Sequence, residues 1–184
     1  MFQSASLAGR HKEMQTWARV RPHRLEPSGL EQHRGRLFRA AYALSQSKED
    51  AEDLVQETYE LVLRRPRFLR RNDALAYLLQ VLRNRWAAQV QSASRRRSRP
   101  APPEDLEWVV DERADPHGSP LEVRLAYEAI AELSEPLRDT IIAVDVAGLS
   151  YREAARVLRT RTGTIMSRLF RAREQVAAAL EAHD

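Results

Sequence analysis

The 184-residue chain contains no cysteine, so disulfides, thiol nucleophiles and cysteine-ligated metals are excluded within it. Its five histidines are scattered rather than clustered. No stretch approaches the roughly 18 consecutive apolar residues that a membrane-spanning helix needs, and the N-terminus lacks the apolar core of a signal peptide. We therefore expect a cytoplasmic protein that has no cofactor, no bound metal and no membrane insertion.

Lysine is nearly absent as well, because it occurs only at Lys12 and Lys48. The excess positive charge, a formal +4 with a pI of about 9.8, is therefore carried almost entirely by arginine. Arginine binds phosphate and guanine better than lysine does, although a GC-rich coding sequence produces the same preference. The composition thus permits a nucleic-acid partner without requiring one.

The stretch 148–173 predicts two short helices joined by a tight turn. Ser150 and Glu153 stand three positions apart, the spacing of a capping box at the start of a helix. A polar run over residues 159–162 interrupts the apolar pattern, which Ile165 and Leu169 then resume four positions apart. This pattern predicts a helix-turn-helix whose second helix enters the major groove of DNA by its N-terminal end.

The outward side of that second helix mixes hydroxyl, thioether and guanidinium groups. Such a mixture suits both base edges and phosphates. The alternative interpretation is an arginine-rich solvated face on an ordinary helical hairpin. The residues concerned are Thr164, Met166, Ser167, Arg168, Arg171 and Arg173.

Apolar stripes of helical period run over residues 30–44, 51–62 and 75–86, and no strand pattern is present. Asn72 or Asp73 is the expected N-cap of the third helix. We expect these three helices to pack into one bundle.

The composition changes sharply after the third helix, where arginines run into prolines and then into an acidic segment. Neither helical nor strand period persists there, so we expect a flexible linker. Helical pattern then returns, with Ser134 as an N-cap and Gly148 as a stop. The expected fold is all-α, with a mobile extension over residues 1–29, helical domains over 30–94 and 120–184, and a flexible tether over 95–119.

The second predicted helix is acidic although the protein is basic. Asp50, Asp53 and Glu57 align on one face, a pattern that would suit a metal or acid–base site. No histidine lies nearby in sequence, and no Glu-x-x-His pair completes a carboxylate metal site. A solvated acidic face and a docking face for a basic partner therefore remain open.

Beside its apolar stripe, the third predicted helix carries aromatic, amide and guanidinium groups, and the loop before it is basic. Rings stack on bases, amides pair with base edges and guanidinium groups hold phosphates, so this surface suits single-stranded nucleic acid. For Tyr77 and Phe68, completion of the hydrophobic core is the alternative.

Segments in three places resemble the bacterial RNA polymerase sigma factors of the small, extracytoplasmic-function (ECF) type. They are Asp50–Thr58, Ala76–Asn84, and Gly148–Ala155 continued by Gly163–Leu169 and Arg171–Arg173. The resemblance covers about residues 30–95 and 120–180, the positions of that family's regions 2 and 4. It implies a protein that is not an enzyme and that directs promoter recognition, DNA melting and transcription initiation.

The resemblance also implies partners and binding residues. Asp50, Asp53, Leu54, Gln56 and Glu57 would contact the β′ clamp helices of core RNA polymerase. An unstacked base of the −10 element would meet Arg70, Arg71, Asn72, Asp73, Tyr77, Gln80, Arg83 and Asn84. The −35 element would meet Arg161, Thr162, Thr164, Met166, Ser167, Arg168 and Arg171. The polymerase β subunit, promoter DNA and an anti-sigma factor are the other implied partners, and residues 95–119 would thread through the polymerase.

The chain departs from the family pattern at three positions. Ala88 stands where members usually have an acid after the −10 helix motif, and Met166 replaces a commonly basic residue. Arg159 stands where a glycine is common in the turn. Either its φ is positive and arginine strains the turn, or the turn is built differently.

Two other functions remain open. One is a sigma-like decoy that sequesters an anti-sigma factor without directing transcription. The other is a simple regulator that binds DNA through residues 134–180 alone. The acidic helix discriminates against the simple regulator, which has no need of it.

Overall fold

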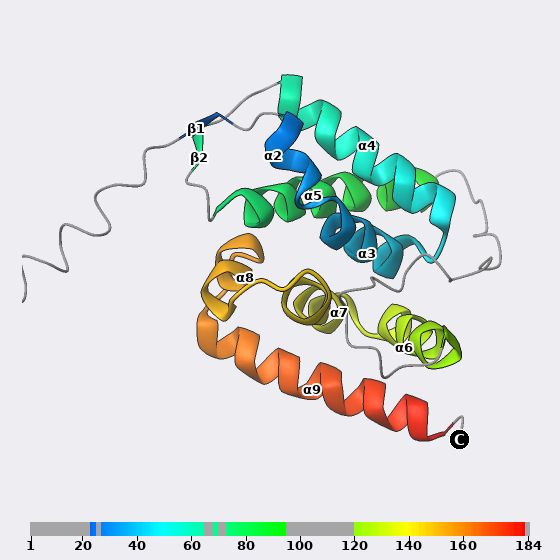
Figure 1. Cartoon of the computed structure of the whole chain (residues 1–184). Helices are drawn as coiled ribbons and strands as arrows, with labels where there is room; N and C mark the ends of the chain where they lie inside the picture. The colour runs from blue at the N-terminus through cyan, green and yellow to red at the C-terminus, as the bar shows by residue number, and fades with distance from the viewer. Residues whose placement is uncertain (1–22, 25–26, 65–67, 70–72, 95–119, 183–184) are drawn as a thin grey trace, which may run out of the picture.

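The computed structural model describes residues 23–24, 27–64, 68–69, 73–94 and 120–182. Within them the fold is helical, as the sequence predicts, and residues 27–94 and 120–182 form two groups of helices that stack on one another (Figure 1).

The first group contains α2 (Pro27–Glu31), α3 (Arg34–Ser45), α4 (Lys48–Arg64) and α5 (Ala74–Ser94). The stripe expected as a single helix from residue 30 is divided between α2 and α3. Because α2 begins at Pro27, residues 27–29 belong to the folded part rather than to the N-terminal extension. The largest fully buried side chains of the group are Leu37, Tyr42, Leu54, Thr58, Val62, Leu78 and Leu82.

The expectation that the chain has no strand was wrong in one place. Strand β1 (His23–Arg24) pairs antiparallel with β2 (Phe68–Leu69), with His23 opposite Leu69 and Arg24 opposite Phe68. Two-residue strands are too short to produce an alternating pattern, so periodicity could not reveal them. The pair joins the segment before α2 to the connection between α4 and α5.

The second group contains α6 (Pro120–Glu132), α7 (Glu135–Ile141), η3 (Ile142–Val146), α8 (Tyr151–Val157) and α9 (Thr162–Glu181). The element η3 is a π-helical turn that continues α7, in which Ala147 N–H donates to the carbonyl of Ile142 at 2.8 Å. Gly148 follows with a φ of +73°, a conformation that glycine adopts without a Cβ clash.

The capping box expected at the start of α8 is confirmed. The Glu153 backbone N–H donates to Ser150 Oγ at 3.4 Å, and Ser150 N–H donates to Glu153 Oε2 at 2.8 Å. Ser134 is the N-cap of α7 as expected, but its side chain makes no capping hydrogen bond there.

The two groups of helices are packed together, whereas the sequence predicted two domains on a flexible tether. Helix α3 contacts α6 and η3, and α5 contacts α8. Apolar side chains face one another at this boundary, with Leu44 and Leu79 on one side and Ala143 and Val157 on the other. The tether itself, residues 95–119, lies outside the described residues.

Candidate nucleic-acid interface

Helix α4 turns most of its carboxylates to solvent because its apolar residues share the opposite, core-facing side. Asp50, Asp53 and Gln56 are exposed there. Leu54 is 0% exposed and lies in the hydrophobic core. Its expected contact with polymerase therefore has to be corrected, since a buried leucine supports the helix but presents no surface to a partner.

Glu57 lies on the edge of the same face and is held by α5. One of its oxygens, Oε2, accepts hydrogen bonds from Arg85 Nε and, at 3.0 Å, from Gln89 Nε2. The bond from Arg85 lowers the pKa of Glu57, against an opposing effect of burial. These two hydrogen bonds connect α4 to α5.

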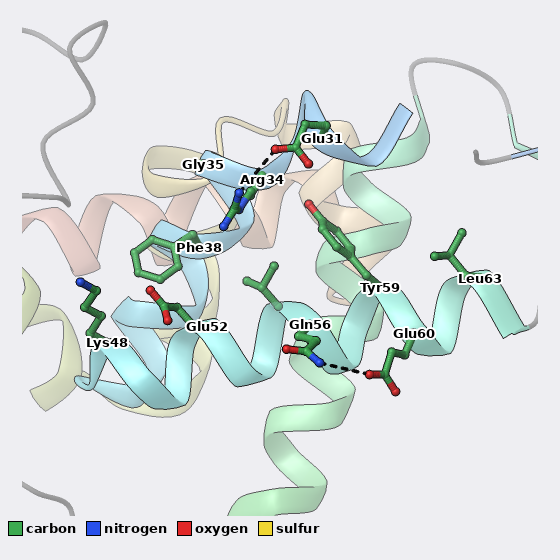
Figure 2. Close-up of a pocket in the computed structure, with 11 residues that line it drawn as sticks. Glu31, Arg34, Gly35, Phe38, Lys48, Glu52, Gln56, Tyr59, Glu60 and Leu63 are labelled. Atoms are coloured by element: carbon green, nitrogen blue, oxygen red, sulfur yellow. Dashed lines mark hydrogen bonds and ion pairs between the residues drawn. The ribbon is translucent and has the colours of Figure 1, made fainter. Parts of the chain in front are cut away.

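A groove of about 840 Å³ lies beside the acidic face, between α3 and α4. Figure 2 shows Phe38, Tyr59 and Leu63 along it, flanked by Glu31, Glu52 and Glu60. The Tyr59 hydroxyl donates to the Leu30 carbonyl at 3.1 Å, and burial raises the pKa of Tyr59 to about 12. Arg34 and Lys48 also line the groove, and Arg34 lies 3.6 Å from a carboxylate oxygen of Glu31, so the apolar floor has charges of both signs at its rim.

The −10 residues predicted on α5 form a surface that is only partly open. Asn84 is exposed, and Gln80 and Arg83 are half-buried. Tyr77 is half-buried and packs against the core, so the core interpretation of this residue holds in part. Arg70, Arg71 and Asn72 lie outside the described residues, and so does the side chain of Phe68.

Two of these −10 residues are engaged by the second group of helices. Arg83 Nε donates to Asp139 Oδ2 of α7 at 2.5 Å, and another nitrogen of Arg83 lies 3.6 Å from Glu135. Asp73 Oδ1 accepts a hydrogen bond from Arg156 of α8 at 3.0 Å. The surface assigned to single-stranded DNA is thus also an intramolecular contact surface.

Asp139 is the most buried member of this set, with 8% of its side chain exposed. Burial raises its pKa, and the hydrogen bond and charge of Arg83 oppose that rise. A buried carboxylate without a cation would be costly, so Arg83 is the partner that makes this position tolerable.

In the second group, α8 and α9 cross over small and branched apolar residues, as the helix-turn-helix prediction requires. Ala154, Ala155, Ile165, Leu169 and Ala172 are all buried. On the outward side, Arg161, Met166, Ser167 and Arg171 are exposed, and Thr162, Thr164 and Arg168 are half-buried.

Of the two turn geometries that the sequence allowed, the structure has the strained one, in which the φ of Arg159 is positive. Arg159 has a φ of +50°. Thr160 N–H donates to the Ala155 carbonyl at 2.9 Å and Arg159 N–H to the Arg156 carbonyl at 3.3 Å, the bonds of a Schellman motif. Arginine therefore occupies the left-handed position that usually favours glycine.

Several residues that organise these surfaces were missed in the sequence. Asp145 receives two hydrogen bonds from Arg173, at 2.9 and 2.7 Å, which fix α9 to η3. Asp139 and Arg156 pair with residues 56 and 83 positions away in the chain. Helical periodicity relates only residues that are close in sequence, so it could not predict these ion pairs.

Within the described ranges, no group of three or more histidine, aspartate and glutamate side chains is arranged to hold a metal ion. None of the helices in that part of the chain combines the length and the apolarity that crossing a lipid bilayer requires.

Comparison with known proteins places both groups of helices in known families. Family models of Sigma-70 region 2 and Sigma-70 region 4 match residues 30–97 and 124–176. The ECF RNA polymerase sigma factor SigE of Mycolicibacterium smegmatis is 32% identical over 157 residues, which are 84% of this chain and 61% of that protein. The ECF RNA polymerase sigma factor SigC of Mycobacterium tuberculosis is 35% identical over 141 residues, 73% of this chain and 72% of that protein.

Among solved structures, the fold is similar to the sigma factor RpoE in complex with the anti-sigma factor NepR from Bartonella quintana. The TM-score is 0.60 at 26% identity, and the match covers 83% of this chain and 92% of that one. Because both regions match in the expected order, and relatives above 30% identity share most of their length, the chain belongs to the ECF RNA polymerase sigma factors.

Proposed function

We propose that this chain binds core RNA polymerase and directs promoter recognition, DNA melting and transcription initiation. The observation that carries the proposal is that α4 exposes acidic side chains whereas α9 exposes basic ones, on a protein that is basic as a whole. Asp50, Asp53 and Gln56 leave an acidic face of α4 open, while α9 turns arginine and hydroxyl side chains outward. The first surface suits a protein partner and the second suits DNA.

The polymerase contact is assigned to α4 through Asp50, Asp53 and Gln56, with Glu57 at its edge. Leu54 supports this helix from within the core. The neighbouring groove between α3 and α4 offers apolar area to the same partner. The exposed acidic side chains of α4 beside this apolar area suit a partner that presents basic and apolar side chains.

Strand capture is assigned to α5 and to the loop before it. Asn84 and Gln80 supply amides for base edges, and Arg83 supplies a cation for phosphate. Holding an unstacked base offsets the cost of a few kcal/mol for removing it from the duplex. Melting would follow from binding energy, so the protein acts as a binding subunit and not as an enzyme.

Recognition of the −35 element is assigned to α9, entering the major groove by its N-terminal end. The residues are Arg161, Thr162, Thr164, Met166, Ser167, Arg168 and Arg171. Two modules on one chain raise each other's effective concentration at the promoter, so each can bind weakly alone. The site of action is the cytoplasm, where polymerase and promoter DNA meet.

Regulation by an anti-sigma factor is part of the proposal. It is supported by the complex between the similar sigma factor RpoE and its anti-sigma factor NepR. The decoy alternative predicts tight binding to an anti-sigma protein without binding to core polymerase. The simple-regulator alternative predicts that the protein binds duplex DNA and that substitutions on α4 do not change this binding.

Transcription in vitro with core polymerase and a genomic promoter library tests the proposal. We expect Asp53→Arg to abolish core binding while helicity and melting temperature stay unchanged, because it reverses the charge of an exposed side chain. Glu181→Arg, the same charge change on an exposed position of α9, is the matched control and should bind core normally. Normal core binding by Asp53→Arg would refute the interface, and no core binding by the wild type would refute the function.

A further inference from the structure

One side of α9 is exposed but carries no charge, although arginines lie beside it. Gly163, Met166, Ser167 and Phe170 stand at positions i, i+3, i+4 and i+7, so they share this side of the helix, and each of them is exposed. Met166 is 55% exposed and Phe170 is 63% exposed. These four residues form the uncharged strip of α9.

The packing of α9 fixes the direction in which the uncharged strip faces. Ile165, Leu169 and Ala172 are at most 2% exposed and point into the core. Because successive residues of a helix are rotated by about 100°, the strip faces away from that core. Arg173 donates two hydrogen bonds to Asp145 of η3, at 2.9 and 2.7 Å, which restrain the rotation of α9 about its own axis.

The length and the surroundings of the strip match the major groove of DNA. From residue 163 to residue 170 the helix rises about 10 Å, which fits a groove about 12 Å wide. Arg168 and Arg171 follow Ser167 and Phe170 around the helix, where they can reach phosphates at the wall of the groove. The exposed carboxylate of Glu174, one turn beyond Phe170, would be repelled by phosphates, so the contact should end before it.

Gly163 allows the backbone of α9 to approach a partner closely at one end of the strip. It lies inside the helix and its φ is not positive, and a Cβ at this position would meet no atom within 4 Å. Neither the backbone conformation nor the space inside the protein therefore requires glycine, which is less favourable in a helix than alanine. Close approach of the backbone to a ligand does require it.

The side chains in the middle of the strip select among the groups that base pairs present. The Ser167 hydroxyl donates to the Thr164 carbonyl at 3.1 Å, so toward a partner it accepts, which suits the amino group of adenine or cytosine. Met166 offers an apolar thioether chain. Among the base edges of the major groove, its apolar counterpart is the C5-methyl group of thymine.

We propose that Met166 is a specificity-determining residue that packs against the C5-methyl group of a thymine in the −35 element, with the uncharged strip facing the floor of the major groove. This inference rests on the proposed role of α9 in −35 recognition. A protein partner fits the strip less well, because two apolar side chains supply little of the roughly 800 Å² that each partner buries in a stable interface.

Replacement of thymine by deoxyuridine tests the contact, because deoxyuridine lacks only the C5-methyl group. Each thymine of the −35 element, on either strand, is replaced in turn in a promoter selected in the transcription assay. The full-length chain bound to core polymerase is titrated at one fixed salt concentration and followed by fluorescence anisotropy. At one of these positions we expect binding to weaken about fourfold, as the loss of one buried methyl group predicts.

Variants of α9 assign that methyl effect to one side chain. Met166→Ala should bind the thymine and deoxyuridine promoters equally, and both about as weakly as the wild type binds the deoxyuridine promoter. Met166→Leu keeps an apolar side chain and should keep the difference. Phe170→Ala is the matched control, because it shortens an equally exposed apolar side chain one turn away, and it should also keep the difference.

Gly163→Ala tests whether the strip lies in the groove. An added methyl group has free space within the protein, so we expect the melting temperature to rise by about 1–3 °C. Promoter binding should nevertheless weaken about fivefold or more, as it does for a mismatched base pair. Unchanged promoter affinity in Gly163→Ala would contradict the proposed orientation of the strip.

The outcomes separate this inference from the proposed function. A wild type that binds the promoter but is insensitive to every deoxyuridine would overturn the role of Met166 and leave promoter recognition intact. The same holds if Met166→Ala keeps the methyl effect, or if only Phe170→Ala loses it. A wild type that binds core polymerase but no promoter would refute the proposed function, and the inference with it.

Discussion

At the residue scale, Arg159 shows how one side chain can oppose the conformation that its turn requires. A left-handed backbone costs a non-glycine residue roughly 1–2 kcal/mol because Cβ crowds the following carbonyl. The Schellman hydrogen bonds of Thr160 and Arg159 nevertheless hold the turn in that form. The turn geometry thus follows from the crossing of α8 and α9, and Arg159 adopts a positive φ despite its energetic cost.

Replacing Arg159 with glycine should therefore stabilise the protein. We expect Arg159→Gly to raise the free energy of unfolding by about 0.5–1 kcal/mol, since relief of strain exceeds the entropy cost of glycine. Urea denaturation measures the change. Arg159→Ala is the matched control, because it removes the same charge but keeps Cβ and should give no gain. Equal stability of the two variants would show that strain is absent.

Glu57 lies at the edge of the exposed acidic face of α4 and stabilises the fold by its hydrogen bonds to α5. Its folded-state pKa is lowered by Arg85, so its contribution to stability is present above its ordinary pKa of 4.5. That contribution declines as the pH falls through the lowered value, where the carboxylate is protonated in both states.

Glu57→Gln should accordingly destabilise the protein at pH 7 by up to about 1 kcal/mol, a modest value because both partners are partly exposed. The difference from wild type should shrink below pH 4.5. Urea titrations between pH 7 and 3.5 follow it. Glu60→Gln, which removes an exposed pair with Arg64 on the same helix, should have a smaller effect at every pH. A difference that grows toward acid would contradict the assigned cause.

At the element scale, two serines at equivalent positions differ in what they contribute. Ser150 satisfies orphan N–H groups of α8 through the capping box, whereas the Ser134 side chain makes no such bond at α7. Both were expected as N-caps from the same residue type. The geometry of each helix start, and not the residue type alone, decides whether the side chain is used.

Ser150→Ala should lower the free energy of unfolding by about 1 kcal/mol, measured by thermal or urea denaturation. Ser134→Ala should stay within about 0.5 kcal/mol of wild type. Helix α8 positions α9, so Ser150→Ala should also weaken duplex binding slightly. Equal losses of unfolding free energy in the two variants would indicate that the capping hydrogen bonds of Ser150 do not stabilise the protein.

At the scale of the whole molecule, exposed acidic and basic side chains gather on different helices, which suits the proposed binding of a protein partner and of DNA at separate places. The acidic face lies on α4 and the outward arginines lie on α9, at opposite sides of the stacked groups in Figure 1. A mixed surface would attract neither partner strongly.

The affinity for promoter DNA should depend on salt concentration through the phosphate contacts of the arginines on α9. Arg171→Ala should weaken binding to the −35 duplex and reduce the slope of log K against log salt by about 1, as loss of one phosphate contact predicts. Arg124→Ala, on α6 and outside this face, should leave both quantities unchanged. Fluorescence anisotropy across a salt series measures them, and an unaltered slope for Arg171→Ala would remove it from the interface.

The spacing of residues within four positions of one another was sufficient to predict the helices, the helix-turn-helix and the capping box. The apolar stripe over residues 51–62 also placed Leu54 in the core, where the structure has it. The contact of Leu54 with polymerase was implied by the family resemblance alone. The ion pairs of Arg83 with Asp139 and of Asp73 with Arg156 could not be predicted in this way. Their partners come together only when two groups of helices pack.

The helices, their inner faces and the outward side chains of α4, α5 and α9 follow from the sequence, because helical period dictates which side chains share a face. The stacking of the two groups, the positive φ of Arg159 and the pairing of Arg83 with a buried carboxylate become visible only in the folded structure. Those outcomes depend on long-range packing, where apolar area and charge pairing between distant segments outweigh local preference.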